Sequence, residues 1–413
     1  MRHLSLSILA LALAGLAFTS CSNDDPITPP ETLTTKYAVT LDMPLNVKDA
    51  KMTSASATLT NVATKETYTT SNFRQNGTQY ADTLEVPYGT YNISVEGNIS
   101  YAFDDTTTVS SPVKSARENV SISNDAASHS VTMALNTFRA QDGLVISEIF
   151  YTGTLTPEGK QYSDDQYFKI ANNSDNTLYL DGLAIVESAF MTVDKQDYTP
   201  NIMDKAMTVD AVYCFPGTGK DHPIEPGQEV VVALNAKNHK EFNPNSIDLS
   251  NADFEIYDES QNPSFTDEDN PNVPNMVNWY DYSASYFTLH NRGFKSYAIG
   301  RPTVDANTFI NDYKYTYKWV FSYGEYTFDM DDEGYKFPND WIVDAVNLSI
   351  ESDFQWLVTS PSLDAGWAHC GNVDHDQNRY GKAVVRKKDG NKWVDTNNST
   401  NDFESDAKPT LLK

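Results

Sequence analysis

The chain has 413 residues, of which 57 are acidic and 30 are basic, and its formal net charge is −27. Such a charge repels nucleic-acid phosphates, so it excludes the nucleic-acid-binding classes that depend on a basic surface. The length exceeds what one small hydrophobic core uses, so we expect two or more domains.

Residues 1–20 have the pattern of an export signal. A short polar head precedes a Leu- and Ala-rich run at 4–18, which is too short to span a membrane stably. The next residues end in Cys21 and resemble a bacterial lipobox, which implies that Cys21 is lipidated and becomes the mature N-terminus. Acyl chains such as palmitate would anchor the protein, because each buried methylene contributes about 0.8 kcal/mol. An ordinary secretory signal with an incidental cysteine is the alternative.

Residues 21–35 are rich in Asp, Pro and Thr, as is typical of a linker. The acidic segment 22–25 is similar to the export tag that places some Gram-negative lipoproteins on the outer face of the outer membrane. This similarity implies a lipid-anchored, surface-exposed outer-membrane protein, whereas a solvated linker is the alternative.

Residues 36–136 predict a small β-sandwich. About seven short strands at close spacing indicate two packed antiparallel sheets. The clearest strands flank a Pro-Tyr-Gly turn at 87–89, with strict alternation after it. This segment resembles transthyretin-like or immunoglobulin-like modules, which usually act as stalks beneath bacterial surface domains.

A larger all-β domain is predicted from Gly143 onward. Two runs of β-branched and aromatic residues, 144–146 and 167–170, flank a polar loop and indicate its first two strands. Further strands follow an Asp-Gly turn and a Pro-Gly turn. The later predicted strands are 178–180, 183–185, 229–233, 341–346 and 381–386.

The order of these strands and turns resembles the lamin-tail domain, an immunoglobulin-like β-sandwich. The matching positions are 145–149, Asn172, Gly182, Gly227, Asp344 and Arg386. The resemblance implies one lamin-tail-like sandwich over 143–390, with long insertions at 187–221 and 236–335, followed by a polar C-terminal tail at 391–413. The whole arrangement is similar to an uncharacterised family of surface lipoproteins, often encoded beside TonB-dependent outer-membrane transporters. That similarity implies such a transporter as a partner.

The second insertion is rich in aromatic residues. Along 313–321 a ring occupies every odd position, which places the rings on one face of a strand. A packed strand is one interpretation, and a stacking platform for a sugar, a haem-like ring or a peptide is the other. The candidate ligand-binding residues are Trp279, Tyr280, Tyr286, Tyr315, Tyr317 and Trp319.

Two segments could hold a metal ion. Asp329, Asp331 and Glu333 alternate before a glycine, which is similar to the first half of an EF-hand loop and predicts a Ca²⁺ site. A solvated charged turn is the alternative. The segment 369–376 gathers His, Cys and Asp, but it lacks the ligand spacing of known zinc motifs.

Apart from Cys21, the chain has two cysteines. Two cysteines in an exported chain suggest one disulfide, between Cys214 and Cys370. Two buried free thiols are the alternative.

No catalytic signature is present, since the chain lacks a nucleophile elbow, a phosphate-binding loop and a dinucleotide fingerprint. We therefore expect a non-enzymatic surface lipoprotein that captures a ligand such as a glycan, or docks on an outer-membrane nutrient transporter through loops of the second domain. A secreted glycan or peptide hydrolase is one alternative, suggested by the long insertions and the loop near His375. A structural adhesin is another.

Overall fold

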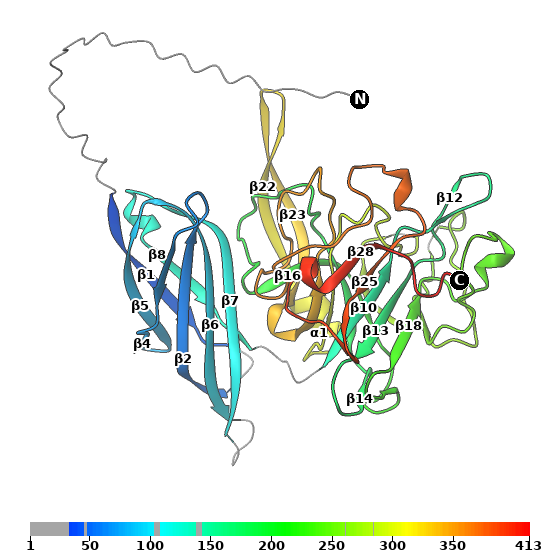
Figure 1. Cartoon of the computed structure of the whole chain (residues 1–413), viewed down its shortest axis with the longest axis horizontal. Coiled ribbons are helices and arrows are strands. Elements are labelled where there is room, and N and C mark those ends of the chain that lie inside the picture. Colours follow the sequence, from blue (N-terminus) through cyan, green and yellow to red (C-terminus); the bar gives the residue numbers. More distant parts are fainter. Residues whose placement is uncertain (1–32, 45–47, 103–107, 138–142, 261, 284) are drawn as a thin grey trace, which may run out of the picture.

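The computed structural model describes residues 33–44, 48–102, 108–137, 143–260, 262–283 and 285–413. The described chain consists mostly of strands, with few helices, and forms two β-sandwiches (Figure 1), which confirms the predicted all-β fold class. Cys21 and the predicted export segments lie outside the described residues. Within the described ranges, no helix has the length and apolar character needed to cross a membrane.

The smaller sandwich has two sheets. The first has the strand order β4 (Arg74–Asn76), β5 (Gln79–Pro87), β1 (Thr34–Asp42) and β8 (Ser130–Ala134). The second has the order β3 (Thr67–Thr70), β2 (Lys48–Asn61), β6 (Gly89–Ala102), β7 (Thr108–Ile122) and β9 (Asn136–Thr137). Alternate residues of β1 and β6, such as Val39 and Ile93, point into the core between the sheets.

The Pro-Tyr-Gly segment connects the two sheets of this domain. β5 ends at Pro87 and β6 begins at Gly89, but the strands belong to different sheets. The Tyr91 hydroxyl donates a hydrogen bond to the Pro87 carbonyl oxygen at 2.8 Å. A Cβ on Gly89 would lie 2.7 Å from Nδ2 of Asn61, so a side chain there would require the Asn61 amide to move.

The larger sandwich also has two main sheets. One has the order β19 (Phe254–Glu255), β18 (Glu229–Ala233), β13 (Tyr167–Asn172), β10 (Leu144–Phe150), β25 (Ala383–Arg386) and β28 (Phe403–Ala407). The other has the order β22 (Lys314–Tyr323), β23 (Tyr326–Pro338), β16 (Ala206–Cys214), β15 (Ala184–Ser188), β21 (Tyr297–Gly300) and β24 (Ile342–Val346), with β20 (Val277–Asp281) paired to β16.

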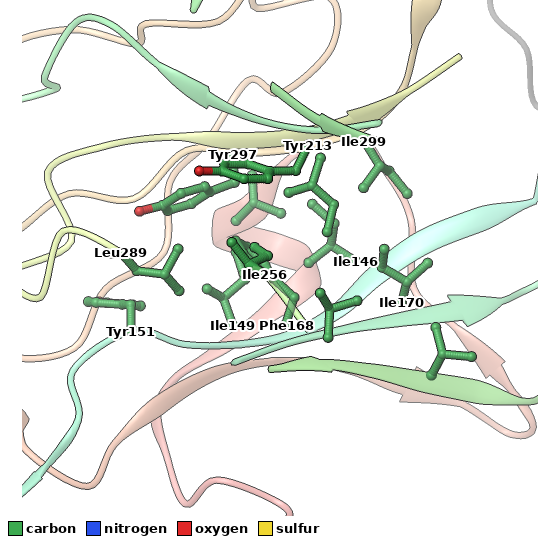
Figure 2. Packing of buried hydrophobic residues seen from close by; sticks show 14 of the residues in the cluster. Ile146, Ile149, Tyr151, Phe168, Ile170, Tyr213, Ile256, Leu289, Tyr297 and Ile299 are labelled. Carbon is green, nitrogen blue, oxygen red and sulfur yellow. The ribbon is translucent and has the colours of Figure 1, made fainter. Parts of the chain in front are cut away.

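The main hydrophobic core lies between these two sheets. Figure 2 shows Tyr213, Tyr297 and Ile299 from one sheet facing Ile146 and Phe168 from the other. The two runs that open the domain in the sequence are neighbouring antiparallel strands, with Leu144 opposite Asn172. Both are buried over their whole length, because each lies near the middle of a sheet that is covered on both faces.

The outer faces of the sheets are covered by loops and short elements. The helix α1 (Ala306–Asp312) covers one sheet through Phe309, which packs on Phe337 and Trp341. The remaining elements are α2 (Ser399–Asp402), the 3-10 turns η1 (Ala126–Ser128), η2 (His239–Glu241), η3 (Asn339–Trp341) and η4 (Gln377–Arg379), and the strand pairs β11 (Thr154–Leu155) with β12 (Gln161–Tyr162), β14 (Leu178–Tyr179) with β17 (Pro223–Ile224), and β26 (Lys388–Asp389) with β27 (Lys392–Trp393).

The two sandwiches contact each other. Arg117 of β7 forms an ion pair with Asp204 in a loop of the larger domain. A cavity of about 410 Å³ lies beside this pair and is lined from both domains by residues that include Glu118, Lys195 and Trp356. Lys195 Nζ lies 3.4 Å from Asp197 Oδ1, so much of the charge around the cavity is paired.

Candidate functional site

The strands β22 and β23 form a long hairpin that projects from the larger domain (Figure 1). They pair along ten residues each, from Lys314 opposite Tyr335 to Tyr323 opposite Tyr326. The base of β23 pairs with β16 only at 335–338. Beyond the base, an isolated bridge joins Lys318 to Thr199. The outer half of the hairpin therefore extends as a two-stranded ribbon.

The inner half of the aromatic face of this hairpin is packed. Tyr317 is 8% exposed and its ring lies 5.4 Å from that of Phe190 and 5.7 Å from that of Tyr198. The hydroxyl of Tyr315 lies 2.6 Å from that of Thr208. These rings belong to a cluster that also contains Trp356, so this part of the strand is core.

The other predicted ligand-binding residues lie elsewhere. Tyr280 packs on Tyr335 with ring centroids 4.2 Å apart, and Trp279 packs on Phe309 at 6.0 Å. Tyr286 is half-buried in a separate loop. The structure therefore does not bring the six predicted residues into one cleft, and only Trp319 leads toward an exposed aromatic surface.

The outer half of the same face is exposed, except for Trp319, which is half-buried and packs on the inner cluster. We call Trp319, Phe321, Tyr326, Phe328 and Met330 the hairpin strip. Phe321 and Phe328 are cross-strand neighbours with ring centroids 6.3 Å apart, and Trp319 lies 6.1 Å from Phe321. The exposed fractions are 44% for Phe321, 50% for Phe328, 70% for Tyr326 and 37% for Met330. Among the described residues, thirteen large apolar side chains are exposed, and four of them (Phe321, Tyr326, Phe328 and Met330) belong to the strip. The strip therefore holds more of the exposed apolar side chains than any other segment.

The opposite face of the hairpin is charged. Lys314 Nζ lies 2.6 Å from Glu333 Oε2, and Lys318 Nζ lies 3.7 Å from Asp331 Oδ1. Asp329 is the cross-strand neighbour of Val320, which is exposed on this face. The projecting ribbon is therefore amphipathic, with an apolar face and a charged face that both lie outside the core.

The predicted calcium site is wrong. Asp329, Asp331 and Glu333 lie on the regular strand β23 rather than in a loop. Alternate residues of a strand are about 6.6 Å apart, so their carboxylates cannot converge on one ion. The described part of the chain contains no group of three His, Cys, Asp or Glu side chains that could hold a metal ion, and this includes the segment 369–376.

The predicted disulfide is also wrong. Cys214 and Cys370 are both buried free thiols. Cys214 packs in the cluster that α1 covers, on the outer face of one sheet, whereas Cys370 packs in the core between the sheets. Because a sheet separates the two environments, the thiols do not meet. Burial raises the pKa of both, that of Cys370 to about 12, so neither is a reactive thiolate.

A buried polar cluster joins β15 and β16 to the loop before β21. Lys295 Nζ lies 2.5 Å from Asp210 Oδ2 and 3.9 Å from Glu187 Oε1, and the Tyr297 hydroxyl donates to Glu187 Oε2 at 2.7 Å. Burial, and then the charge of Asp210, raises the pKa of Glu187 to about 8. Burial also raises the pKa of Asp210 to about 6. Burial therefore favours the protonated form of the Glu187 carboxyl.

This cluster borders a cavity of about 230 Å³ that is also lined by His290 and Tyr282. Perturbed carboxyl groups beside a cavity can indicate catalysis. However, Lys295 also donates to the carbonyl oxygens of Ser188 and Ala189 at 2.8 and 3.1 Å. All three ammonium hydrogens thus have acceptors, so no free amine is available as a nucleophile. The ion pairs and hydrogen bonds of the cluster connect β15, β16 and the loop before β21 inside the domain.

The sequence contains one local signal for this cluster, which does not by itself reveal the cluster. Glu187 interrupts the apolar strand Ala184–Ser188, whose residues are all buried. A charged residue at a buried strand position requires a partner. The partners, Asp210 and Lys295, are distant in sequence, so only the fold identifies them.

The comparisons with known proteins agree with this architecture. Residues 225–410 match the family model described as "Protein of unknown function (DUF4876)". This part of the chain, residues 225–410, is similar to the DUF4876 family. It contains the projecting hairpin, Lys295 and Arg386, whereas Glu187 and Asp210 precede it.

A solved structure of a DUF4876 family protein from Bacteroides thetaiotaomicron matches with a TM-score of 0.55 and 22% identity, covering 91% of this chain and 96% of that chain. This likeness extends over both domains and shows a shared fold. A second structure, from Parabacteroides distasonis, has 10% identity and a TM-score of 0.16, with 79% and 89% of the two chains covered, and this score is too low to support any argument. No curated protein matches the chain.

Proposed function

We propose that the protein is a non-enzymatic lipoprotein, anchored at Cys21 on the outer surface of the outer membrane, and that it docks there through the hairpin strip. The observation that carries the proposal is the hairpin itself, whose aromatic face is core in its inner half and exposed in its outer half. A contiguous exposed apolar surface on a soluble domain usually marks an interaction site.

The charge distribution and the polar cores support a binding role over a catalytic one. The carboxylate of Glu148 accepts hydrogen bonds from Tyr167 at 2.6 Å and from Thr410, and it lies 3.7 Å from Lys169 Nζ. The Glu187 cluster is likewise internally satisfied. These internal contacts account for the burial of both carboxyl groups by their part in stabilising the fold.

We also propose a lamin-tail-like larger domain, a transporter as the partner and a stalk role for the smaller domain. The larger domain is taken as lamin-tail-like because Asp344 and Arg386, two positions of that resemblance, pair between its sheets. A TonB-dependent transporter is the outer-membrane partner that the sequence resemblance suggests. The smaller sandwich then acts as a stalk between the anchor and the docking domain.

Site-specific photo-crosslinking in intact cells tests this proposal. We expect a crosslinker at Phe328 to label an outer-membrane component, and a crosslinker at Thr327, its neighbour on the charged face, to label it far less. Protease added to intact cells should also degrade the protein. Contacts confined to periplasmic proteins, equal labelling from both positions, or a protein that partitions with the soluble fraction would contradict the proposal.

Ligand capture is a second candidate function, supported by the cavity between the domains. Its volume, about 410 Å³, lies within the range of small-molecule sites, which often occur at domain interfaces. Its lining of Trp, Asn and charge-paired side chains is compatible with an uncharged, hydroxyl-rich ligand such as a glycan. Calorimetric titration with oligosaccharides tests this candidate, with Asn119→Ala as the cavity variant. A hydrolase would shorten the oligosaccharide, whereas a binding protein would leave its length unchanged.

A further inference from the structure

We propose that the hairpin strip inserts into the lipid–water interface of the membrane that carries the anchor, so that the protein rests on the bilayer at two points. The inference rests on the proposed function for the lipid at Cys21 and names the lipid surface as what the strip contacts. Three observations support it: the aromatic and apolar side chains of the strip, the position of the hairpin in the fold, and the short length of chain between Cys21 and the first strand.

The side chains of the strip are of the kind found at membrane interfaces. Trp and Tyr favour that region because their rings are apolar and their N–H or O–H groups are polar. Trp319 shows this dual character, since its ring packs beside Phe321 while its Nε1 donates to Asp332 Oδ2 at 2.5 Å. Phe328 and Met330, the cross-strand neighbours of Phe321 and Trp319, add purely apolar surface to the same face.

The geometry of the ribbon suits shallow insertion. Pairing between β22 and β23 satisfies the backbone groups that face the partner strand. Those at the two outer edges of the ribbon still need water, so the side chains of the outer turn can enter only the hydrated interface and not the hydrocarbon core. The charged face, with Lys318 and Asp331 paired, can remain toward water. An amphipathic element of this kind lies in the interface plane and does not span the bilayer.

The strip and the start of the described chain lie at the same end of the molecule. In Figure 1 the first residues of β1 lie at the top of the smaller domain, and the tip of the β22–β23 hairpin projects farther in the same direction. Eleven residues, 22–32, lie between Cys21 and Leu33, and such a segment reaches at most about 40 Å when extended. A lipid at Cys21 would therefore hold this end of the protein close to the bilayer.

The charge of the hairpin determines which lipids it favours. Glu325, Asp329 and Asp331 are exposed near its tip, and the chain as a whole carries a net charge of −27. Anionic headgroups would repel this surface. The attraction must therefore come from apolar burial, and we expect binding that is strongest on zwitterionic lipid and almost independent of salt.

Vesicle flotation tests the inference without the anchor. The chain from residue 22 onward retains every described residue and lacks Cys21. It is mixed with phosphatidylcholine vesicles, or with vesicles of equal parts phosphatidylcholine and phosphatidylglycerol. The strip variant is Phe321→Ser/Tyr326→Ser/Phe328→Ser. The matched control is Val320→Ser, which removes an equally exposed apolar side chain from the charged face of the same ribbon. Circular dichroism and thermal melting establish that both variants fold.

We expect the unsubstituted chain and Val320→Ser to float with phosphatidylcholine, and the strip variant to lose at least about tenfold in partition coefficient. Phosphatidylglycerol should weaken binding. No flotation, equal flotation of the strip variant, or stronger binding to anionic vesicles would overturn the inference. A concentration-dependent dimer that the strip variant abolishes, without flotation, would identify a second copy as the occupant instead.

Failure of the inference and failure of the proposed function are distinguishable. If Phe328 crosslinks to an outer-membrane protein in cells but the chain does not bind vesicles, docking remains and the lipid contact is rejected. If the chain binds vesicles through the strip but is neither lipidated nor surface-exposed in cells, the proposed function fails and the lipid affinity of the hairpin remains.

Discussion

Arg386 on β25 and Asp344 on β24 form a buried ion pair between the two sheets of the larger domain, with Nη2 and Oδ2 2.5 Å apart. Their side chains are 1% and 3% exposed. Arg386 Nε also donates to the Ile146 carbonyl oxygen at 2.8 Å, and Asp344 Oδ2 accepts from the Ile146 backbone N–H at 2.7 Å. The pair and its contacts with Ile146 thus link β24, at the edge of one sheet, to β25 and its neighbour β10 in the other sheet.

Replacing one member of this pair should destabilise the larger domain strongly. We expect Arg386→Met to lower the free energy of unfolding by about 3–5 kcal/mol, because it leaves the Asp344 carboxylate buried without its counter-ion. Chemical denaturation measures this change. Lys387→Met is the control, since Lys387 is exposed and its substitution should cost less than about 1 kcal/mol. Similar losses for both variants would argue against the buried pair.

The Glu187 cluster should make stability depend on pH. Burial raises the pKa of Glu187 to about 8 in the folded chain, above the ordinary value of about 4.3 in the unfolded chain. A raised pKa means that the folded state holds the proton more tightly. The stabilising contribution of this proton is therefore complete below about pH 4.3 and is lost as the pH rises through about 8.

Glu187→Gln should remove this pH dependence. The amide keeps an oxygen for the Tyr297 hydroxyl and carries no ionisable proton, so we expect melting temperatures close to those of the unsubstituted chain near pH 5. At pH 8 and above the variant should be the more stable of the two. The measurement is thermal melting from pH 5 to 9. A constant difference between the two chains over that range would show that Glu187 does not titrate in this window.

The two buried thiols should be inaccessible and unlinked. In the chain from residue 22 onward, we expect a thiol-reactive dye to label neither Cys214 nor Cys370 in the folded state and both after unfolding without reductant, because burial keeps them protonated and shielded. Reductant should leave the melting temperature unchanged. Unfolded protein that reacts only after reduction would instead demonstrate a disulfide.

The acidic strand should not respond to calcium. Asp329, Asp331 and Glu333 are spaced along β23, and two of them are paired with lysines across the hairpin. We therefore expect millimolar Ca²⁺ to leave the melting temperature unchanged for the unsubstituted chain. The variant Asp329→Asn/Asp331→Asn/Glu333→Gln should respond to Ca²⁺ in the same way. A rise in melting temperature that this variant abolishes would restore the calcium site.

Local patterns in the sequence predicted many strands of this protein correctly. The opening runs at 144–146 and 167–170 fall within β10 and β13, and the odd-numbered rings of 313–321 do share one face of a strand. The same kind of local pattern gives a wrong prediction where pairing between segments that are distant in sequence determines the structure. The segment 329–334 predicts either a calcium loop or a solvated turn, because an acidic loop and an acidic strand have the same composition, and only pairing with β22 shows that it is a strand.

The all-β fold class can be predicted from the sequence, because the two-residue alternation that places side chains on one face of a strand is a property of neighbouring residues. Which of those faces are covered depends on the packing of distant segments. Tyr317 and Phe328 lie on the same apolar face of one hairpin, yet the first is buried against Phe190 and the second is exposed. That difference, like the meeting of Glu187 with Lys295, depends on chain segments distant in sequence, and no local pattern records where they pack.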